Sequence, residues 1–209
     1  MGLVDKLVGG LFAKPQPIVT RAELADFMNS RAAFLAQKCI VEFCRVRAGV
    51  YWQKLFAEKE FQAELDLSRW RAFPPAFAMV AEMVEGSLRE AAGIRQRQLP
   101  ERLTGLAKDV FARYPVPAGE DPAFWAQALD LVDRQLAKTQ AGPPRPVREM
   151  PKPMARAVFN VLPMHKDVVT NDYDYIFNNL RMNLLRAHED FLKVADLNAV
   201  AANLLDTAR

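Results

Sequence analysis

The stretch RAELADFMNSRAAFLAQKCIVEFCRVRAGVYWQKLFA, residues 21–57, decides the fold. At about 100° per residue, its apolar side chains fall on three stripes that begin at Phe27, Met28 and Ile40, so the segment is apolar nearly all round. A helix of this kind has to be surrounded by other elements. The sequence therefore predicts that residues 21–57 form the long central helix of a multi-helix bundle, and Gly49 is a candidate for a bend in it.

The beginning of this helix carries its own signal. Thr20 lies three residues before Glu23, which is the spacing of a capping box. In that arrangement each of the two side chains accepts a hydrogen bond from a backbone N–H that the helix start leaves unpaired. We therefore expect the helix to begin directly after Thr20.

Apolar spacing remains helical along most of the chain, and prolines punctuate it. Phe73-Pro74-Pro75 is expected to end a helical segment over residues 60–72, because proline removes a backbone donor and clashes with the preceding turn. Further helices are expected over 75–98, 100–114, 121–142, 154–161 and 171–193, and at the carboxy terminus. No run alternates in the manner of a β-strand, so the predicted fold class is all-α.

The predicted organisation has four parts. Residues 1–17 form an amphipathic amino-terminal arm with a proline hinge, residues 18–142 form the bundle core, and residues 154–209 form carboxy-terminal helices packed on the same bundle. Between the last two lies a proline-rich linker at 143–153, for which polyproline II is the natural conformation. The linker is expected to be a stiff connector, with a proline-rich ligand for an aromatic groove as the alternative.

Composition narrows the classes of partner and the compartment. The 209 residues are 51% hydrophobic, and 28 basic against 25 acidic side chains leave a net charge of only +3. This balance does not favour nucleic acid as a partner, since phosphate neutralisation requires a concentrated basic surface. Cys39 and Cys44 would lie about 140° apart around a helix, so neither a disulfide nor a shared metal is expected. With no secretory signal or membrane-spanning run, we expect a cytoplasmic protein.

The segment MGLVDKLVGGLFAKPQP at residues 1–17 is amphipathic. It contains two glycines and is too short to form a stable helix alone, so a surface must cover its apolar side. That surface can be the protein's own core, another subunit or a membrane, and a protein surface is preferred because the segment carries little charge. The residues expected to make this contact are Leu3, Val4, Leu7, Val8, Leu11 and Phe12.

Signatures of catalysis are absent from the sequence. His165, its neighbour Asp167, and His188 are the candidates for acid–base chemistry, since histidine titrates near neutrality. No nucleophile motif, phosphate-binding glycine loop or metal-ligand spacing accompanies them. No cofactor or metal is expected, and an enzyme or small-ligand protein with a pocket near His165, Tyr173 and His188 is the alternative.

Two surfaces stand out among the polar residues. Arg31, Lys38 and Arg45 recur every seven residues and form a candidate anion-binding edge, or they pack their aliphatic stems and keep their charges in water. A polar contact face is expected in the stretch 170–183, where asparagines that are poor helix formers accompany tyrosines and an arginine. Its candidate residues are Tyr173, Tyr175, Asn178, Asn179, Arg181 and Asn183.

These patterns favour a non-enzymatic interaction or regulatory protein. It would bind a protein partner, or a second copy of itself, through the amino-terminal arm and the polar face of the carboxy-terminal helix. The third hypothesis is peripheral membrane association through residues 2–13, which would place a cytoplasmic protein at the membrane surface.

Overall fold

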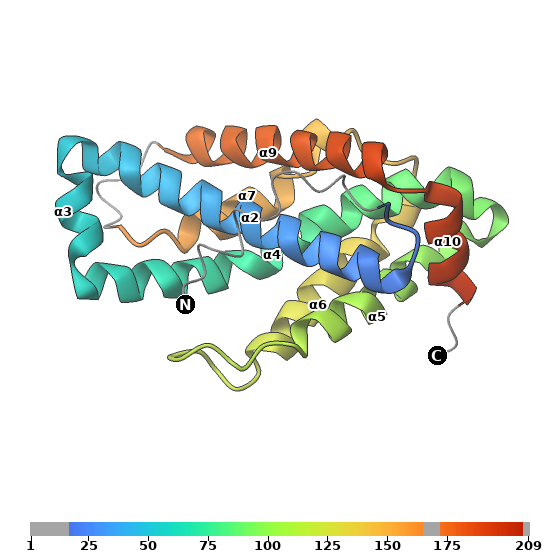
Figure 1. Ribbon diagram of the computed structural model, residues 1–209, viewed down its shortest axis with the longest axis horizontal. Coiled ribbons are helices and arrows are strands. Elements are labelled where there is room, and N and C mark those ends of the chain that lie inside the picture. The colour runs from blue at the N-terminus through green and yellow to red at the C-terminus, as the bar shows by residue number, and fades with distance from the viewer. Residues whose placement is uncertain (1–16, 165–171, 207–209) are drawn as a thin grey trace.

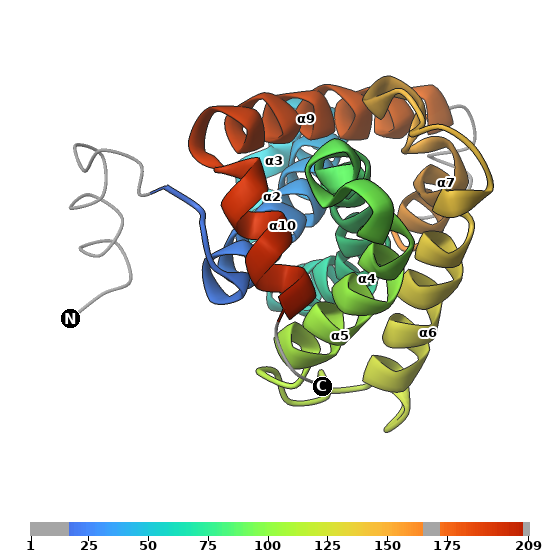
Figure 2. The same cartoon turned by 90° about the vertical axis from the view of Figure 1, so that its right-hand side faces the viewer.

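The computed structural model describes residues 17–164 and 172–206, and within these ranges it is an all-α bundle without named strands. The predicted fold class is confirmed. The described helices are α2 (Arg21–Ala48), α3 (Trp52–Ala57), α4 (Lys59–Ala92), α5 (Leu99–Phe111), α6 (Phe124–Ala137), α7 (Lys152–Asn160), α9 (Tyr173–Val194) and α10 (Leu197–Asp206). Figures 1 and 2 show their arrangement.

Short 3₁₀ segments join several of these helices. They cover Gly49–Tyr51, Gly93–Gln98, Thr139–Ala141 and Val147–Glu149. None of the helices in the described ranges combines the length and apolarity needed to cross a bilayer.

Helix α2 begins where the capping box predicts. The Thr20 hydroxyl accepts a hydrogen bond from the Glu23 backbone N–H at 3.2 Å, and the Glu23 carboxylate accepts one from the Thr20 N–H at 2.9 Å. Backbone donors at Val19 and Thr20 hold the pKa of Glu23 below its ordinary value. Just before the cap, Ile18 pairs with Ala195 in a single bridge, which ties the entry to α2 to the junction of α9 and α10.

The surrounded helix of the bundle is α4, and the prediction that residues 21–57 form it is wrong. Every residue from 72 to 85 is buried, and α4 packs against α2, α5, α6, α7 and α10. Helix α2 ends instead at Ala48, and Gly49, with φ 54°, turns the chain into α3. This φ favours glycine, because a side chain at Cβ would clash with the backbone. Phe34, midway along α2, is 47% exposed, so α2 lies at the edge of the bundle.

The predicted break at Phe73-Pro74-Pro75 is also wrong. Helix α4 continues through both prolines, which are buried within it. Proline costs a helix one hydrogen bond and adds strain, so the surrounding packing has to compensate. The Phe73 ring lies 6.0 Å from the rings of Phe77 and Phe111 and 6.2 Å from that of Trp125. Tertiary packing of this aromatic cluster therefore overrides the local preference of the sequence.

Truncation at the centre of the aromatic cluster should be costly. Phe77 is fully buried and its ring lies 5.1 Å from that of Phe111. Phe77→Ala is expected to lower the free energy of unfolding by about 3–5 kcal/mol, because it removes apolar burial and leaves a cavity. Urea denaturation followed by circular dichroism measures the change. The matched control, Phe34→Ala on the bundle edge, should cost far less, and equal losses would contradict this assignment of the core.

Candidate functional site

Helices α2 and α9 lie side by side and run in opposite directions (Figure 1). The pairing is set by contacts along their whole length. At one end Arg31 pairs with Asp190 at 3.2 Å, and the rings of Phe27 and Phe191 lie 5.2 Å apart. At the other end Arg47 pairs with the buried Asp172 at the start of α9. The sequence predicts neither helix as the partner of the other.

A polar network crosses the middle of this seam. Lys38 Nζ lies 2.8 Å from Glu42 Oε1, and Asn179 Nδ2 donates to Glu42 Oε2 at 3.0 Å. Asn183 Nδ2 in turn donates to the backbone oxygen and to Oδ1 of Asn179, both at 2.9 Å. Partial burial opposes ionisation of Glu42, but the hydrogen bonds from Lys38 and Asn179 outweigh it and lower the pKa of the carboxyl. Glu42 is therefore ionised at neutral pH and holds the two helices together.

Exposed apolar side chains flank the network. Phe34 and Met182 are each 47% exposed and Tyr175 is 37% exposed. Spacings of three and four residues place them on the same stripes as the polar groups of each helix. Lys38 also lies over the Phe34 ring, and the charge of Arg186 acts on Glu42. We name this set of residues the α2–α9 face: Phe34, Lys38, Glu42, Tyr175, Asn179, Met182 and Arg186.

The six residues predicted as one polar contact face are divided by the structure. Tyr175 and Asn179 belong to the α2–α9 face, and Asn178 is exposed. Tyr173 contacts α7, since the Arg156 guanidinium lies 4.1 Å from the Tyr173 ring centre. The Arg181 guanidinium lies 5.7 Å from the ring centre of Phe177 in its own helix. Asn183 is buried, with its side chain turned back on α9.

The cations predicted as an anion-binding edge all have contacts inside the protein. Arg31 pairs with Asp190, Lys38 pairs with Glu42, and the Arg45 guanidinium lies 4.7 Å from the Trp52 ring centre. Lys38 thereby joins the α2–α9 face, whereas Arg45 belongs to the end of α2. The edge is not one groove of free positive charge.

The histidine-centred alternative is only partly described. His165 and Asp167 lie outside the described residues, as do all the residues of the predicted amino-terminal contact. Tyr173 and His188 are fifteen residues apart in α9, about 22 Å at 1.5 Å per residue, so the structure does not bring them together. Burial lowers the pKa of the half-buried His188, while nearby Glu189 opposes the shift. The imidazole is thus neutral near pH 7, as expected for a packing histidine.

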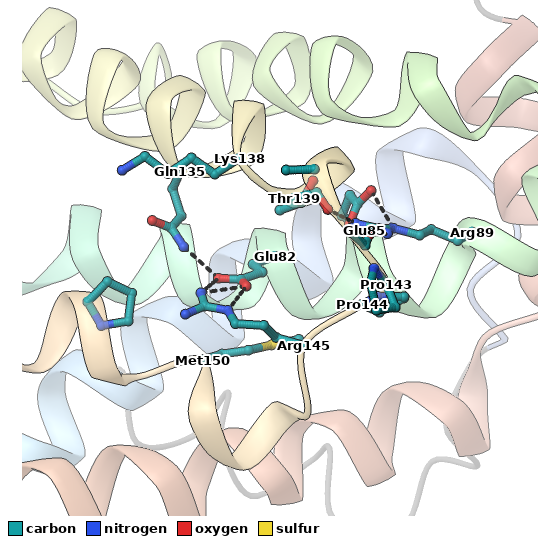
Figure 3. Close-up of a pocket in the computed structure, with 14 residues that line it drawn as sticks. Glu82, Glu85, Arg89, Gln135, Lys138, Thr139, Pro143, Pro144, Arg145 and Met150 are labelled. Carbon is teal, nitrogen blue, oxygen red and sulfur yellow. Dashed lines mark hydrogen bonds and ion pairs between the residues drawn. The ribbon is translucent and has the colours of Figure 1, made fainter.

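A second site, which the sequence does not reveal, lies beneath the proline-rich segment (Figure 3). This pocket of about 440 Å³ is lined on one side by Glu82, Glu85, Gly86 and Arg89 of α4. The first two are buried carboxylates in an otherwise apolar part of the helix. A buried charge requires a partner, and the partners come from other parts of the chain.

Each carboxylate is held by a separate set of donors. Arg145 of the proline-rich segment donates to Glu82 from Nε at 2.7 Å and from Nη2 at 2.6 Å, while Gln135 of α6 donates to it at 2.7 Å. Figure 3 shows Gln135 and Arg145 approaching Glu82 from opposite sides. Arg89, one helical turn after Glu85, forms a bidentate ion pair with the Glu85 carboxylate. Arg89 also donates hydrogen bonds to the backbone oxygens of Thr139 and Gly142.

A glycine permits this close docking. A Cβ built on Gly86 would lie 3.2 Å from Pro144 Cβ, closer than an ordinary contact. The segment predicted as a stiff connector, residues 143–153, is fastened to α4 by Arg145, and its last residues begin α7. Just before it, the Gly142 carbonyl accepts a hydrogen bond from Arg89 of α4. We name the arrangement of Glu82, Glu85, Arg89, Gln135 and Arg145 the α4 clamp. It can fix α6 and the linker, and its charged groups already have partners within the protein.

Among the described residues, no three histidine, cysteine, aspartate or glutamate side chains gather closely enough to hold a metal ion. The Cys39 and Cys44 thiols are buried, and burial raises the pKa of each to about 12. They therefore remain protonated and unreactive at neutral pH.

Comparison of the chain with protein family models, curated proteins and solved structures gives no match.

The α4 clamp predicts a large effect of one linker residue on stability. Arg145→Ala should lower the free energy of unfolding by about 2–3 kcal/mol, because it leaves the Glu82 carboxylate buried with Gln135 as its remaining donor. The loss is smaller than for a fully buried pair since the Arg145 side chain is 37% exposed.

Urea denaturation provides the measurement, and Arg134→Ala is the matched control. Arg134 pairs with Asp130 at 2.7 Å on the exposed side of α6, so its loss should cost less than about 0.5 kcal/mol. If the two arginine variants are equally stable, Arg145 does not fasten the linker.

Proposed function

We propose that this chain is a non-enzymatic helical interaction protein that associates with a second copy of itself through the α2–α9 face. The observation that carries the proposal is the exposure of Phe34, Tyr175 and Met182 around an ordered polar network on two adjacent helices. Apolar groups surrounded by paired polar groups are the usual composition of a protein contact surface.

The charges of the face suit a copy of itself. Lys38 and Arg186 are positive and Glu42, between them, is negative, so the face carries both signs within a short distance. In a two-fold symmetric dimer the same patch meets itself, and a residue on one copy faces a different residue on the other. Antiparallel apposition can therefore bring the Glu42 carboxylate of one copy opposite a cation of its partner, while Phe34 and Met182 pack between the copies.

The predicted amino-terminal contact remains a separate part of this proposal. Its six apolar residues lie outside the described residues, so its support is the amphipathic pattern alone. The α2–α9 face is the part that the described geometry supports, and it is the part that the experiment addresses.

The test is the molar mass in solution, measured by size-exclusion chromatography with light scattering over a range of concentrations. The wild type should approach twice the chain mass as concentration rises. Phe34→Asp combined with Met182→Asp should weaken association at least about tenfold, because each change places a charge in the apolar part of the interface. Both positions are half exposed, so thermal stability should change little.

Ile94→Asp is the matched control, since Ile94 is fully exposed in the 3₁₀ segment that follows α4. It should associate like the wild type. A wild type that stays monomeric at its highest soluble concentration would contradict the proposal, and so would an α2–α9 variant that dimerises normally.

A further inference from the structure

One end of the bundle presents a second exposed apolar surface, independent of the α2–α9 face. There α2 ends, Gly49 turns the chain into α3, and α3 crosses to the start of α4 (Figure 1). Val46, Val50 and Tyr51 are 60%, 88% and 73% exposed. No other part of the described chain has consecutive large apolar residues as open to solvent as Val50 and Tyr51.

Exposed cations flank these apolar residues in the sequence. Arg45, Arg47, Lys54 and Lys59 are all exposed, against the two acidic residues Glu58 and Glu60 in the same stretch. Arg47 also pairs with Asp172, so part of its charge is used within the protein. We name residues 45–60 the α3 tip.

Aromatic side chains pack together on the inner side of the tip. The half-buried Trp52 lies beneath the Arg45 guanidinium, its ring is 6.0 Å from that of Phe56, and Phe56 is 5.3 Å from Phe61. This packing fixes the turn, so Val50 and Tyr51 project from a rigid support. Tyrosine and tryptophan are the aromatic residues that favour the boundary between water and lipid headgroups.

We propose that the α3 tip docks on an anionic membrane surface, with Val50 and Tyr51 entering the headgroup region and Arg45, Lys54 and Lys59 contacting lipid phosphates. The tip forms one end of the bundle and bears its most exposed side chains at the turn, where a broad, deformable surface can reach them. Each lysine or arginine close to an anionic leaflet strengthens binding roughly fivefold, so three cations add a substantial contribution to the apolar contact. Binding should weaken as salt screens these charges.

The opposite end of α4 provides a matched comparison. Gly93 has the same φ of 54° as Gly49, begins a 3₁₀ turn in the same way, and is followed by the fully exposed Ile94. That turn lacks a second exposed apolar neighbour, and its Arg95 pairs with Asp206 at 2.5 Å. The two ends thus share a backbone turn but differ in apolar area and available charge.

The experiment is flotation of the full-length protein with vesicles of phosphatidylcholine, with and without phosphatidylglycerol. The wild type should float with the anionic vesicles, less at high salt, and remain in solution with neutral ones. Val50→Asp combined with Tyr51→Asp should lower the bound-to-free ratio at least about tenfold. Ile94→Asp should bind like the wild type. Quenching by brominated lipid should affect Trp52, and the effect should disappear in Trp52→Phe.

Two results would overturn the proposal. The first is a wild type that does not float with anionic vesicles at low salt. The second is a Val50→Asp, Tyr51→Asp variant that still binds them. If Leu7→Asp combined with Leu11→Asp abolishes binding while the tip variant retains it, the amino-terminal segment is the membrane contact and the α3 tip is not. Neither result depends on the α2–α9 face, so self-association is judged separately.

Discussion

The burial of two carboxylates in α4 constrains the rest of the bundle. Glu82 and Glu85 lie in a stretch in which every residue is removed from water, and isolated charges in such a place would be very costly. Arg89 supplies one partner from the same helix, whereas Gln135 and Arg145 have to arrive from α6 and from the proline-rich segment. The position of α6 and the path of the chain between α6 and α7 are therefore tied to the charges on α4.

The charges of the α4 clamp are paired within the protein, and this bears on where the protein can contact other molecules. The pocket beneath the proline-rich segment is lined by charged groups, yet its carboxylates are already engaged by the protein's own donors. The exposed apolar groups lie elsewhere: the α2–α9 face has three exposed apolar side chains, and the α3 tip has three more. Exposed apolar groups at the edge of a packed interior support the proposal that the chain is an interaction protein.

Features that depend on nearby residues are predictable from the sequence. Thr20 and Glu23 identify the start of α2 because both partners of the capping box lie within one turn. Apolar periodicity gives the all-α class and places α9 within a few residues of its observed bounds. The prediction of a helix break at Pro74-Pro75 is wrong because the aromatic rings that pack against α4 at that point come from α5 and α6, which are distant in the sequence.

Features that depend on which helices become neighbours are not predictable in this way. Tyr175 and Arg181 look equivalent in the sequence, but Tyr175 packs against Phe43 of α2, whereas Arg181 lies over the Phe177 ring of its own helix. In the sequence alone, Glu82 and Glu85 look like residues of an exposed polar edge, because their partners are distant. The signal that such partners exist is the presence of carboxylates within a helix that is apolar on all sides. The sequence predicts that residues 21–57 are surrounded on all sides. Residue type alone does not distinguish the exposed apolar side chains of this segment from those in the core.

We propose that α4 is the rigid, enclosed element of the protein and that contacts with other molecules are made at the edge. Hydrogen–deuterium exchange at low and high protein concentration tests it most directly. The amides of residues 72–89, apart from Pro74 and Pro75, which have no amide hydrogen, should exchange slowest at both concentrations, and protection that rises with concentration should be confined to segments 31–42 and 175–186. Exchange in α4 as fast as in α3, or a rise in protection located elsewhere on the bundle, would contradict it.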